Sequence, residues 1–88
     1  MYKKNSYGNY QCPCCGYYTL KDSYENTFEL CEVCFWENDG IQFGDPDYEG
    51  GANGVSLNQA RENFSKFGAC YEWSTGSVRQ PTAEEKEV

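Results

Sequence analysis

Histidine is absent from this sequence of 88 residues, and basic residues are few. Without histidine the chain has no Ser-His-Asp triad, no Cys-His pair and no histidine-ligated zinc. Lys and Arg number 7 against 14 Asp and Glu, which gives a net charge of −7. Binding to phosphate groups needs clustered positive charge, so we expect no nucleic-acid partner.

Long hydrophobic runs are also missing, since the longest is VCFW at positions 33–36. The polar start, MYKKNS, resembles no signal peptide, and no segment is long enough for a transmembrane helix. We therefore expect a cytoplasmic protein without membrane contact. In that compartment thiols stay reduced, and paired cysteines are more typical of metal ligands than of disulfides.

Leu, Ile, Val and Phe together make only 13 of the 88 residues, a level that favours disorder. Two features oppose disorder: aromatic residues make up 17% of the chain, and there are 6 cysteines. A chain of this length buries too little apolar surface to be held by its core alone. We therefore expect a covalent or metal staple.

The chain divides into three parts by composition. Residues 1–9 are polar and predict a flexible N-terminal segment, and residues 80–88 predict an acidic, disordered tail. Between them, residues 10–79 form a single domain. Residues 37–54 are rich in Gly, Asp and Asn and predict a loop, with Ile41 and Phe43 packed on the core.

Two short segments predict a β-hairpin that joins the cysteine pairs. The segment 17–20 (YYTL) is aromatic and β-branched, and 26–30 alternates polar and apolar residues. A last short strand is expected at 69–73. The predicted fold is a small α+β domain held by a metal, with a hairpin like that of zinc ribbons or rubredoxins and one C-terminal helix.

The helix is predicted over residues 57–67. Leu57, Ala60, Phe64 and Phe67 follow at helical spacing and make one apolar stripe. Ser56 is the expected N-cap, Gln59 would complete a capping box, and Gly68 stands where a left-handed glycine ends many helices.

Four cysteines follow the pattern C-x₂-C-x₁₅-C-x₂-C, which is zinc-site spacing. The predicted metal ligands are Cys12, Cys15, Cys31 and Cys34. Two thiolates three positions apart in a tight knuckle point at one ion, and a hairpin brings two knuckles together. Four thiolates leave no open position on zinc, so such a site is structural rather than catalytic, and we expect no enzyme.

Alternatives to this assignment remain at the level of sequence. Cys14 lies next to Cys15 and would be a ligand in another register, while Phe35 replaces the glycine that follows the first pair, which predicts a looser second knuckle. Iron suits four thiolates as zinc does, and six cysteines also allow disulfides. Cys14 and Cys70 would be either buried small residues or, for Cys14, a reactive thiol.

Four segments together resemble the cysteine-rich CPCC family of small, mostly bacterial proteins. They are YQCPCCGYYTL at 10–20, CEVCFWENDGIQ at 31–42, DPDYEGGAN at 45–53 and SLNQARENF at 56–64. The resemblance covers about residues 10–69. It implies a module like a zinc ribbon and no particular activity.

The acidic, glycine-rich loop matches two binding motifs only in part. Asp45, Asp47 and Glu49 are spaced as in an EF-hand, but Ser56 stands where the bidentate Glu belongs. The glycines at 50–54 lack the Lys of a phosphate-binding loop. The simpler interpretation is that the acids are solvated turn residues and that the glycines let the backbone cross closely over the zinc ribbon.

Phe35 and Trp36 are expected first of all as core residues that cover the metal site. If one of them is exposed, the acids and aromatics after the second knuckle make a candidate surface for a protein partner. Its residues are Trp36, Glu37, Asp39, Phe43, Asp45 and Asp47. An acidic protein suits a basic partner, so we predict a non-enzymatic zinc module that binds a basic protein. The alternatives are a redox protein using iron or Cys14 and, against the charge, a nucleic-acid-binding ribbon.

Overall fold

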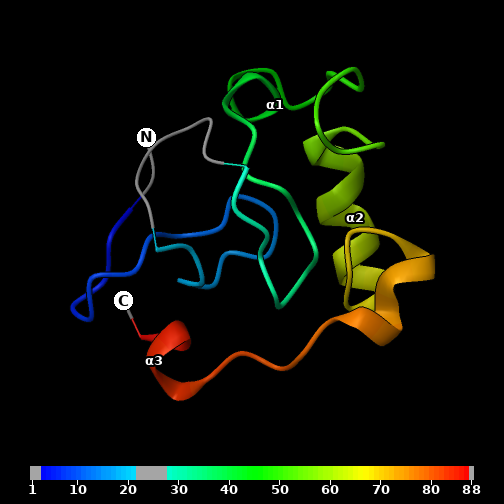
Figure 1. The fold of residues 1–88 in the computed structure, drawn as a ribbon. Helices are drawn as coiled ribbons and strands as arrows, with labels where there is room; N and C mark the ends of the chain where they lie inside the picture. Colours follow the sequence, from blue (N-terminus) through cyan, green and yellow to red (C-terminus); the bar gives the residue numbers. More distant parts are fainter. Residues whose placement is uncertain (1–2, 22–27, 88) are drawn as a thin grey trace.

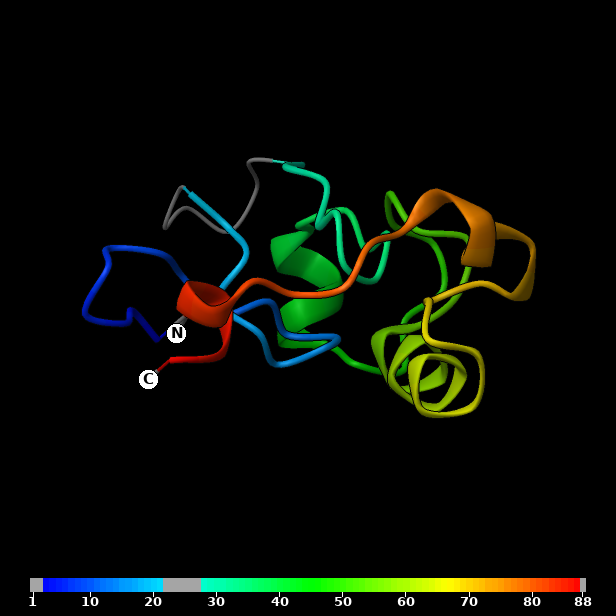
Figure 2. The same cartoon turned by 90° about the horizontal axis from the view of Figure 1, so that it is seen from below.

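The computed structural model describes residues 3–21 and 28–87. Its helices are α1 (Gly40–Gly44), α2 (Leu57–Phe67), the 3₁₀ helix η1 (Glu72–Ser77) and α3 (Ala83–Lys86). α2 and α3 lie on opposite sides of the molecule, with most of residues 10–20 and 28–37 between them (Figures 1 and 2). The cysteine-bearing segments are therefore the centre of the fold.

The predicted hairpin between the cysteine pairs is wrong. Leu20 pairs with Tyr10 and Leu30 pairs with Glu37, so each cysteine pair is closed by its own flanking residues. These are isolated antiparallel bridges, and the described segments contain no extended strand. A knuckle reverses the chain, which makes its own flanks the partners with the shortest loop to close. Part of the predicted segment 26–30 lies outside the described residues.

The predicted helix at 57–67 is confirmed with the same bounds. The Ser56 hydroxyl accepts the N–H of Gln59 at 3.1 Å, and Gly68 has a φ of 81°. The capping box is only half made, because the Gln59 side chain donates to Asn63 instead. Leu57 and Ala60 are buried, whereas Phe67 at the other end of the stripe is exposed.

α1 lies inside the segment predicted as a loop. Asp39 caps it by accepting the N–H groups of Ile41 and Gln42, at 2.8 and 3.3 Å. Gln42 is the side chain that α1 buries. Ile41 is 62% exposed, so the expectation that it packs on the core is wrong. Phe43 packs against the core, as predicted.

The C-terminal part differs from expectation. Residues 69–73 form no strand, and η1 begins at Glu72. The segment 78–82 then crosses the molecule to α3 (Figures 1 and 2). The tail expected to be disordered carries α3, with a complete capping box between Thr82 and Glu85.

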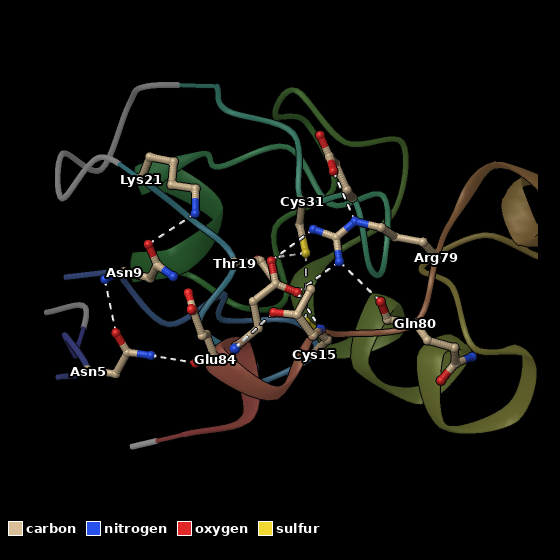
Figure 3. A network of polar contacts seen from close by, with 12 residues as sticks. Asn5, Asn9, Cys15, Thr19, Lys21, Cys31, Arg79, Gln80 and Glu84 are labelled. Carbon is tan, nitrogen blue, oxygen red and sulfur yellow. Dashed lines mark hydrogen bonds and ion pairs between the residues drawn. The ribbon is translucent and has the colours of Figure 1, made fainter. Parts of the chain in front are cut away.

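The N-terminal segment packs on α3. The Asn5 amide donates to the carbonyl of Glu84 at 2.9 Å, and its oxygen accepts the N–H of Asn9 (Figure 3). The same amide donates to the carbonyl of Glu87 at 3.0 Å. Asn5 and Asn9 are both buried. Polar contacts of this kind leave no hydrophobic periodicity for sequence analysis to detect.

The core is small and rich in sulfur. Its fully buried side chains include Trp36, Leu20 and Leu57, and most of the cysteines pack among them. None of the described helices has the length and apolar character needed to cross a membrane.

Candidate metal centre

The first knuckle is wound by two backbone hydrogen bonds. Gly16 donates its N–H to the carbonyl of Cys12 at 2.9 Å, and Cys12 donates its N–H to Tyr17 at 2.8 Å. Gly16 has a φ of 82°, a left-handed conformation that is strained for residues with a Cβ. This winding turns Cys12 and Cys15 toward the same side.

The second knuckle repeats this pattern bond for bond. Phe35 donates to the carbonyl of Cys31 at 2.7 Å, and Cys31 donates to Trp36 at 2.8 Å. Phe35 has a φ of 75°, so it adopts the conformation of Gly16 despite its side chain. The expectation of a looser second knuckle is wrong.

The two knuckles bring four sulfur atoms together. The Sγ atoms of Cys12, Cys15, Cys31 and Cys34 all lie within 4.8 Å of one another. Cys12 and Cys34 are 3.6 Å apart, and Cys15 and Cys31 are 3.7 Å apart. A tetrahedral ion with bonds of about 2.3 Å to sulfur needs S···S edges of about 3.8 Å, so the cluster fits one such ion.

The same distances exclude disulfides within the cluster, since a disulfide bond is about 2.05 Å long. All six cysteines are free thiols in the structure. Cys14, the alternative ligand of the first knuckle, is buried but stands outside the group of four. The structure therefore groups Cys12 and Cys15, and not Cys14, with the second cysteine pair.

The four thiols of the cluster strongly affect one another's ionisation. Hydrogen bonds, first from Cys12 and then from the other thiols, hold the pKa of Cys31 well below its ordinary value. The pKa of Cys12 is raised, chiefly by burial, and that of Cys34 is raised, first by its hydrogen bond to Cys12. One thiolate is thus stabilised at the expense of its neighbours. A divalent cation would let all four ionise together.

Thr19 supports the cluster from outside the four thiols. Its hydroxyl lies 2.9 Å from the Cys31 sulfur, and Figure 3 shows the two side chains directed at each other. Thr19 is buried, so this contact is shielded from water. Sequence analysis placed Thr19 in the resemblance to the family but gave it no role. A hydroxyl near a cysteine in space but distant in sequence carries no local signal.

A cavity of about 250 Å³ opens beside the first knuckle. Cys15, Phe43 and Arg61 line it, and Arg61 donates to the carbonyl of Pro13 at 2.8 Å. Cys15 is half-buried, whereas the other three sulfur-bearing residues of the cluster are fully buried. The cluster is therefore most accessible at Cys15.

The two remaining thiols are buried. Cys70 is fully buried, and burial raises the pKa of its thiol. Its backbone N–H donates to the carbonyl of Cys34 at 2.7 Å, which ties the end of α2 to the second knuckle. Cys14 is also buried, at 8% exposure, so neither thiol has the open surroundings of a reactive cysteine.

The C-terminal segment braces both knuckles. Arg79 makes two 2.8 Å hydrogen bonds to the buried carboxylate of Glu85 and a third, of 3.0 Å, to Glu32 in the second knuckle. The Glu85 carbonyl accepts the N–H of Tyr18, which follows the first knuckle. The Arg79 contact lowers the pKa of Glu85. This brace was missed because its members lie up to 67 positions from one another.

The predicted partner surface is divided by the structure. Trp36 and Asp39 are buried, at 0% and 4% exposure, and do not belong to any surface. Asp39 also accepts the N–H of Ala52 at 2.8 Å, so it fastens the glycine-rich loop to α1. Glu37 and Phe43 are half-buried. Asp45 and Asp47 are the exposed members.

The glycine-rich loop does approach another segment closely, as expected, but that segment is α1 rather than a cysteine knuckle. A Cβ on Gly51 would lie 2.5 Å from the Asp39 carboxylate and 2.6 Å from Gln42. Asn53, also in this loop, exchanges hydrogen bonds with both backbone groups of Glu37.

Comparison with known proteins gives the family of the chain and no curated relative. The family model described as cysteine-rich CPCC matches residues 10–85, which include both knuckles, Thr19 and the Arg79 brace. This chain belongs to the cysteine-rich CPCC family.

Proposed function

We propose that the protein is a non-enzymatic module in which one zinc ion holds the fold and the folded surface binds a basic protein. The ion would be bound by Cys12, Cys15, Cys31 and Cys34. The observation that carries the proposal is the close grouping of these four sulfur atoms, all within 4.8 Å of one another, in the centre of the fold. Thiolates are soft ligands that suit zinc, and four of them leave no place for a substrate.

A structural role is supported by the composition of the core. The cysteines occupy central core positions, and few large aliphatic side chains are buried with them. Structural zinc is worth on the order of 10–16 kcal/mol of apparent binding free energy, while small domains have a total stability of only about 5–15 kcal/mol. The ion would therefore supply most of the folding free energy.

A basic partner is supported by the charge of the chain. The sequence carries −7, and four thiolates with one divalent ion would add two further negative charges. Asp45 and Asp47 are exposed near the second knuckle in sequence. Exposed charges of this kind act mainly on the rate of encounter with an oppositely charged protein.

Native mass spectrometry of protein purified without added metal tests the metal site. We expect one zinc ion per chain, no rapid alkylation of the folded protein, and alkylation of all six thiols once unfolding releases the ion. Cys31→Ser should lose the ion and the cooperative fold, while the matched variant Cys70→Ser should keep the ion. Retention of zinc by Cys31→Ser, or its loss in Cys14→Ser but not in Cys15→Ser, contradicts the ligand set.

The same preparation distinguishes zinc from the alternative, iron. A ferric site with four thiolates is red, whereas a zinc site is colourless. Phe35 winds the second knuckle as a glycine would, so the backbone suits both ions, and the absorption spectrum decides. A red protein that cycles between oxidised and reduced forms would replace the proposed function with electron transfer.

Partner binding is tested separately by pull-down from the native host at low and high salt. We expect basic proteins that dissociate as salt rises, because screening weakens exposed ionic contacts. Nucleic acid that remains bound at physiological salt would contradict the proposal in favour of a nucleic-acid-binding ribbon.

A further inference from the structure

Three aromatic rings meet on the surface beside the second knuckle. Trp73 stacks on Tyr71, with centroids 4.7 Å apart and an angle of 19°, and it meets Phe35 edge-on at 5.5 Å and 81°. We call Phe35, Tyr71 and Trp73 the aromatic platform. Trp73 is 70% exposed although the other two rings are partly buried. The metal site uses none of these rings as a ligand.

The platform is held in place by its surroundings. The Tyr71 hydroxyl accepts the N–H of Gly54 at 2.7 Å, and the Tyr71 carbonyl accepts both the N–H and the hydroxyl of Ser74. Phe35 reaches Trp73 from a left-handed backbone position that costs about 1–2 kcal/mol for a residue with a Cβ. An exposed tryptophan held by two neighbouring rings is preorganised for binding, since it loses little freedom when a ligand arrives.

Two acidic residues, Glu37 and Glu72, accompany the platform. The backbone of Glu37 is hydrogen-bonded to Asn53, whose neighbour Gly54 donates to the Tyr71 hydroxyl. Burial raises the pKa of Tyr71, and the charge of Glu37 adds to that rise. Glu72 is exposed and stands between the two stacked residues in the sequence. Aromatic faces attract cations, tryptophan most strongly, and carboxylates nearby strengthen that attraction.

We propose that the aromatic platform binds an arginine side chain of a basic protein, with the guanidinium stacked on Trp73. The flat guanidinium stacks on aromatic rings better than the ammonium of lysine does. The inference rests on the proposed function for the basic character of the partner, and it names where and by which group that partner is recognised. Single-stranded nucleic acid also stacks on aromatic rings, but it needs a positive groove, and this chain carries −7.

Isothermal titration of the full, metal-loaded chain with an octa-arginine peptide tests the platform. The matched variant is Tyr7→Ala, because Tyr7 is 54% exposed and the turn at 5–8 lies at the opposite end of the molecule from η1 (Figures 1 and 2). We expect Trp73→Ala to weaken binding about two- to fivefold, the size of an exposed cation–π contact, and Tyr7→Ala to leave it unchanged.

Two further measurements test whether binding depends on the aromatic face of Trp73 and on the positive charge of the peptide. Trp73→Leu keeps an apolar side chain without an aromatic face, so it should weaken binding as Trp73→Ala does. A peptide of eight citrullines, which has the same shape without the charge, should not bind. Equal binding by Trp73→Leu and the wild type, or equal losses in Tyr7→Ala and Trp73→Ala, would overturn the platform. So would tighter binding of an eight-nucleotide oligothymidylate.

Failure of the platform is distinguishable from failure of the proposed function. Native mass spectra of the same samples report zinc, which Trp73 does not touch as a ligand. If Trp73→Ala retains zinc and still captures the basic proteins of the host as the wild type does, the platform is wrong and the proposed module stands. If no zinc is found but peptide binding depends on Trp73, the platform stands and the zinc assignment falls.

Discussion

Phe35 adopts the backbone conformation of Gly16 at the equivalent position of the other knuckle. Their φ angles are 75° and 82°, and each donates its N–H to the carbonyl of the first cysteine of its pair. The two cysteine pairs are thus wound in the same way by different residues. The second pair achieves this against the strain that a Cβ creates in a left-handed conformation.

Replacing Phe35 measures this strain. Phe35→Ala and Phe35→Gly both lose the ring, but only the glycine relieves the backbone. The relief of about 1–2 kcal/mol is partly offset by about 0.5–1 kcal/mol of extra chain entropy in unfolded glycine. We therefore expect Phe35→Gly to be more stable than Phe35→Ala by about 0.5–1 kcal/mol in urea unfolding at one fixed zinc concentration.

Gly16→Ala is the control, because it introduces the same strain into the first knuckle. A Cβ there meets only the Gln11 side chain, at 3.9 Å, so no collision adds to the backbone effect. The loss of stability in Gly16→Ala should equal the difference in stability between Phe35→Gly and Phe35→Ala. A Phe35→Ala variant as stable as Phe35→Gly would show that the left-handed position carries no strain.

Thr19→Val tests the hydroxyl at the Cys31 sulfur. Valine has the shape of threonine without the donor, so the thiolate loses one hydrogen bond while the packing is kept. Groups that hydrogen-bond to metal ligands typically change affinity by about 10–100-fold, and we expect the lower value here because one bond of several is removed. Competition with a chelator measures it, with the exposed Thr75→Val as the control. Equal affinities in both variants would contradict a role for Thr19.

The Arg79–Glu85 pair predicts a pH-dependent contribution to stability. Because the Arg79 contact lowers the folded pKa of Glu85, the contribution is complete above the unfolded value of about 4.3 and is lost as pH falls through the folded pKa. Near neutral pH we expect Glu85→Gln to cost about 1–2 kcal/mol, since Arg79 is partly exposed to solvent.

Loss of the proposed metal ion at low pH would affect the wild type and Glu85→Gln alike, so the difference between them isolates the pair. That difference in unfolding free energy should shrink as the solution is acidified. Glu62→Gln removes the exposed Lys66–Glu62 pair and should cost less than about 0.5 kcal/mol. A difference that grows toward low pH would contradict the assignment.

Local signals in the sequence predicted the parts of the fold that are local. Ser56, the apolar stripe and Gly68 fixed the bounds of α2, and the spacing of the cysteines predicted which four sulfur atoms meet. The prediction of a hairpin was wrong. The segment YYTL at 17–20 suits a strand by composition, but Leu20 pairs with Tyr10, on the other side of the same knuckle. Composition reports strand propensity but not pairing.

Long-range polar contacts account for what sequence analysis missed. Asn5 joins α3 from 79 positions away, and Arg79 reaches Glu32 across 47 positions. Neither contact is periodic or apolar, so each residue taken alone suggests a solvated surface. Asp39 was placed on a partner surface for the same reason, because an acid after a tryptophan shows no sign of the three N–H groups it accepts.

The cap of α2 predicts unequal effects for two neighbours. Ser56→Ala should lower stability by about 0.5–2 kcal/mol, because its hydroxyl is the acceptor for the Gln59 N–H. Gln59→Ala should change stability by less than about 0.5 kcal/mol, since its side chain bonds to Asn63 on the exposed face instead of closing the box. Thermal unfolding of the metal-loaded variants measures both. A loss in Gln59→Ala as large as that in Ser56→Ala would mean that the capping box forms in solution.

Replacement by asparagine should lower the stability of the protein at Asp39 but not at Asp45. In Asp39→Asn one acceptor oxygen becomes an NH₂ group that faces an N–H donor, of Ala52 or of α1, and the buried mismatch should cost about 1–3 kcal/mol. Asp45→Asn changes an exposed side chain and should leave stability within about 0.5 kcal/mol.

For the rate of partner binding, the exposed acids should matter instead. Asp45→Asn together with Asp47→Asn should slow association with the octa-arginine peptide at low salt, because the loss of exposed charge weakens steering. Stopped-flow association and urea unfolding of the same proteins separate the two effects. An Asp39→Asn variant as stable as the wild type would contradict the buried hydrogen-bonding role of Asp39. An unchanged association rate in the double variant would contradict a role of Asp45 and Asp47 in attracting the partner.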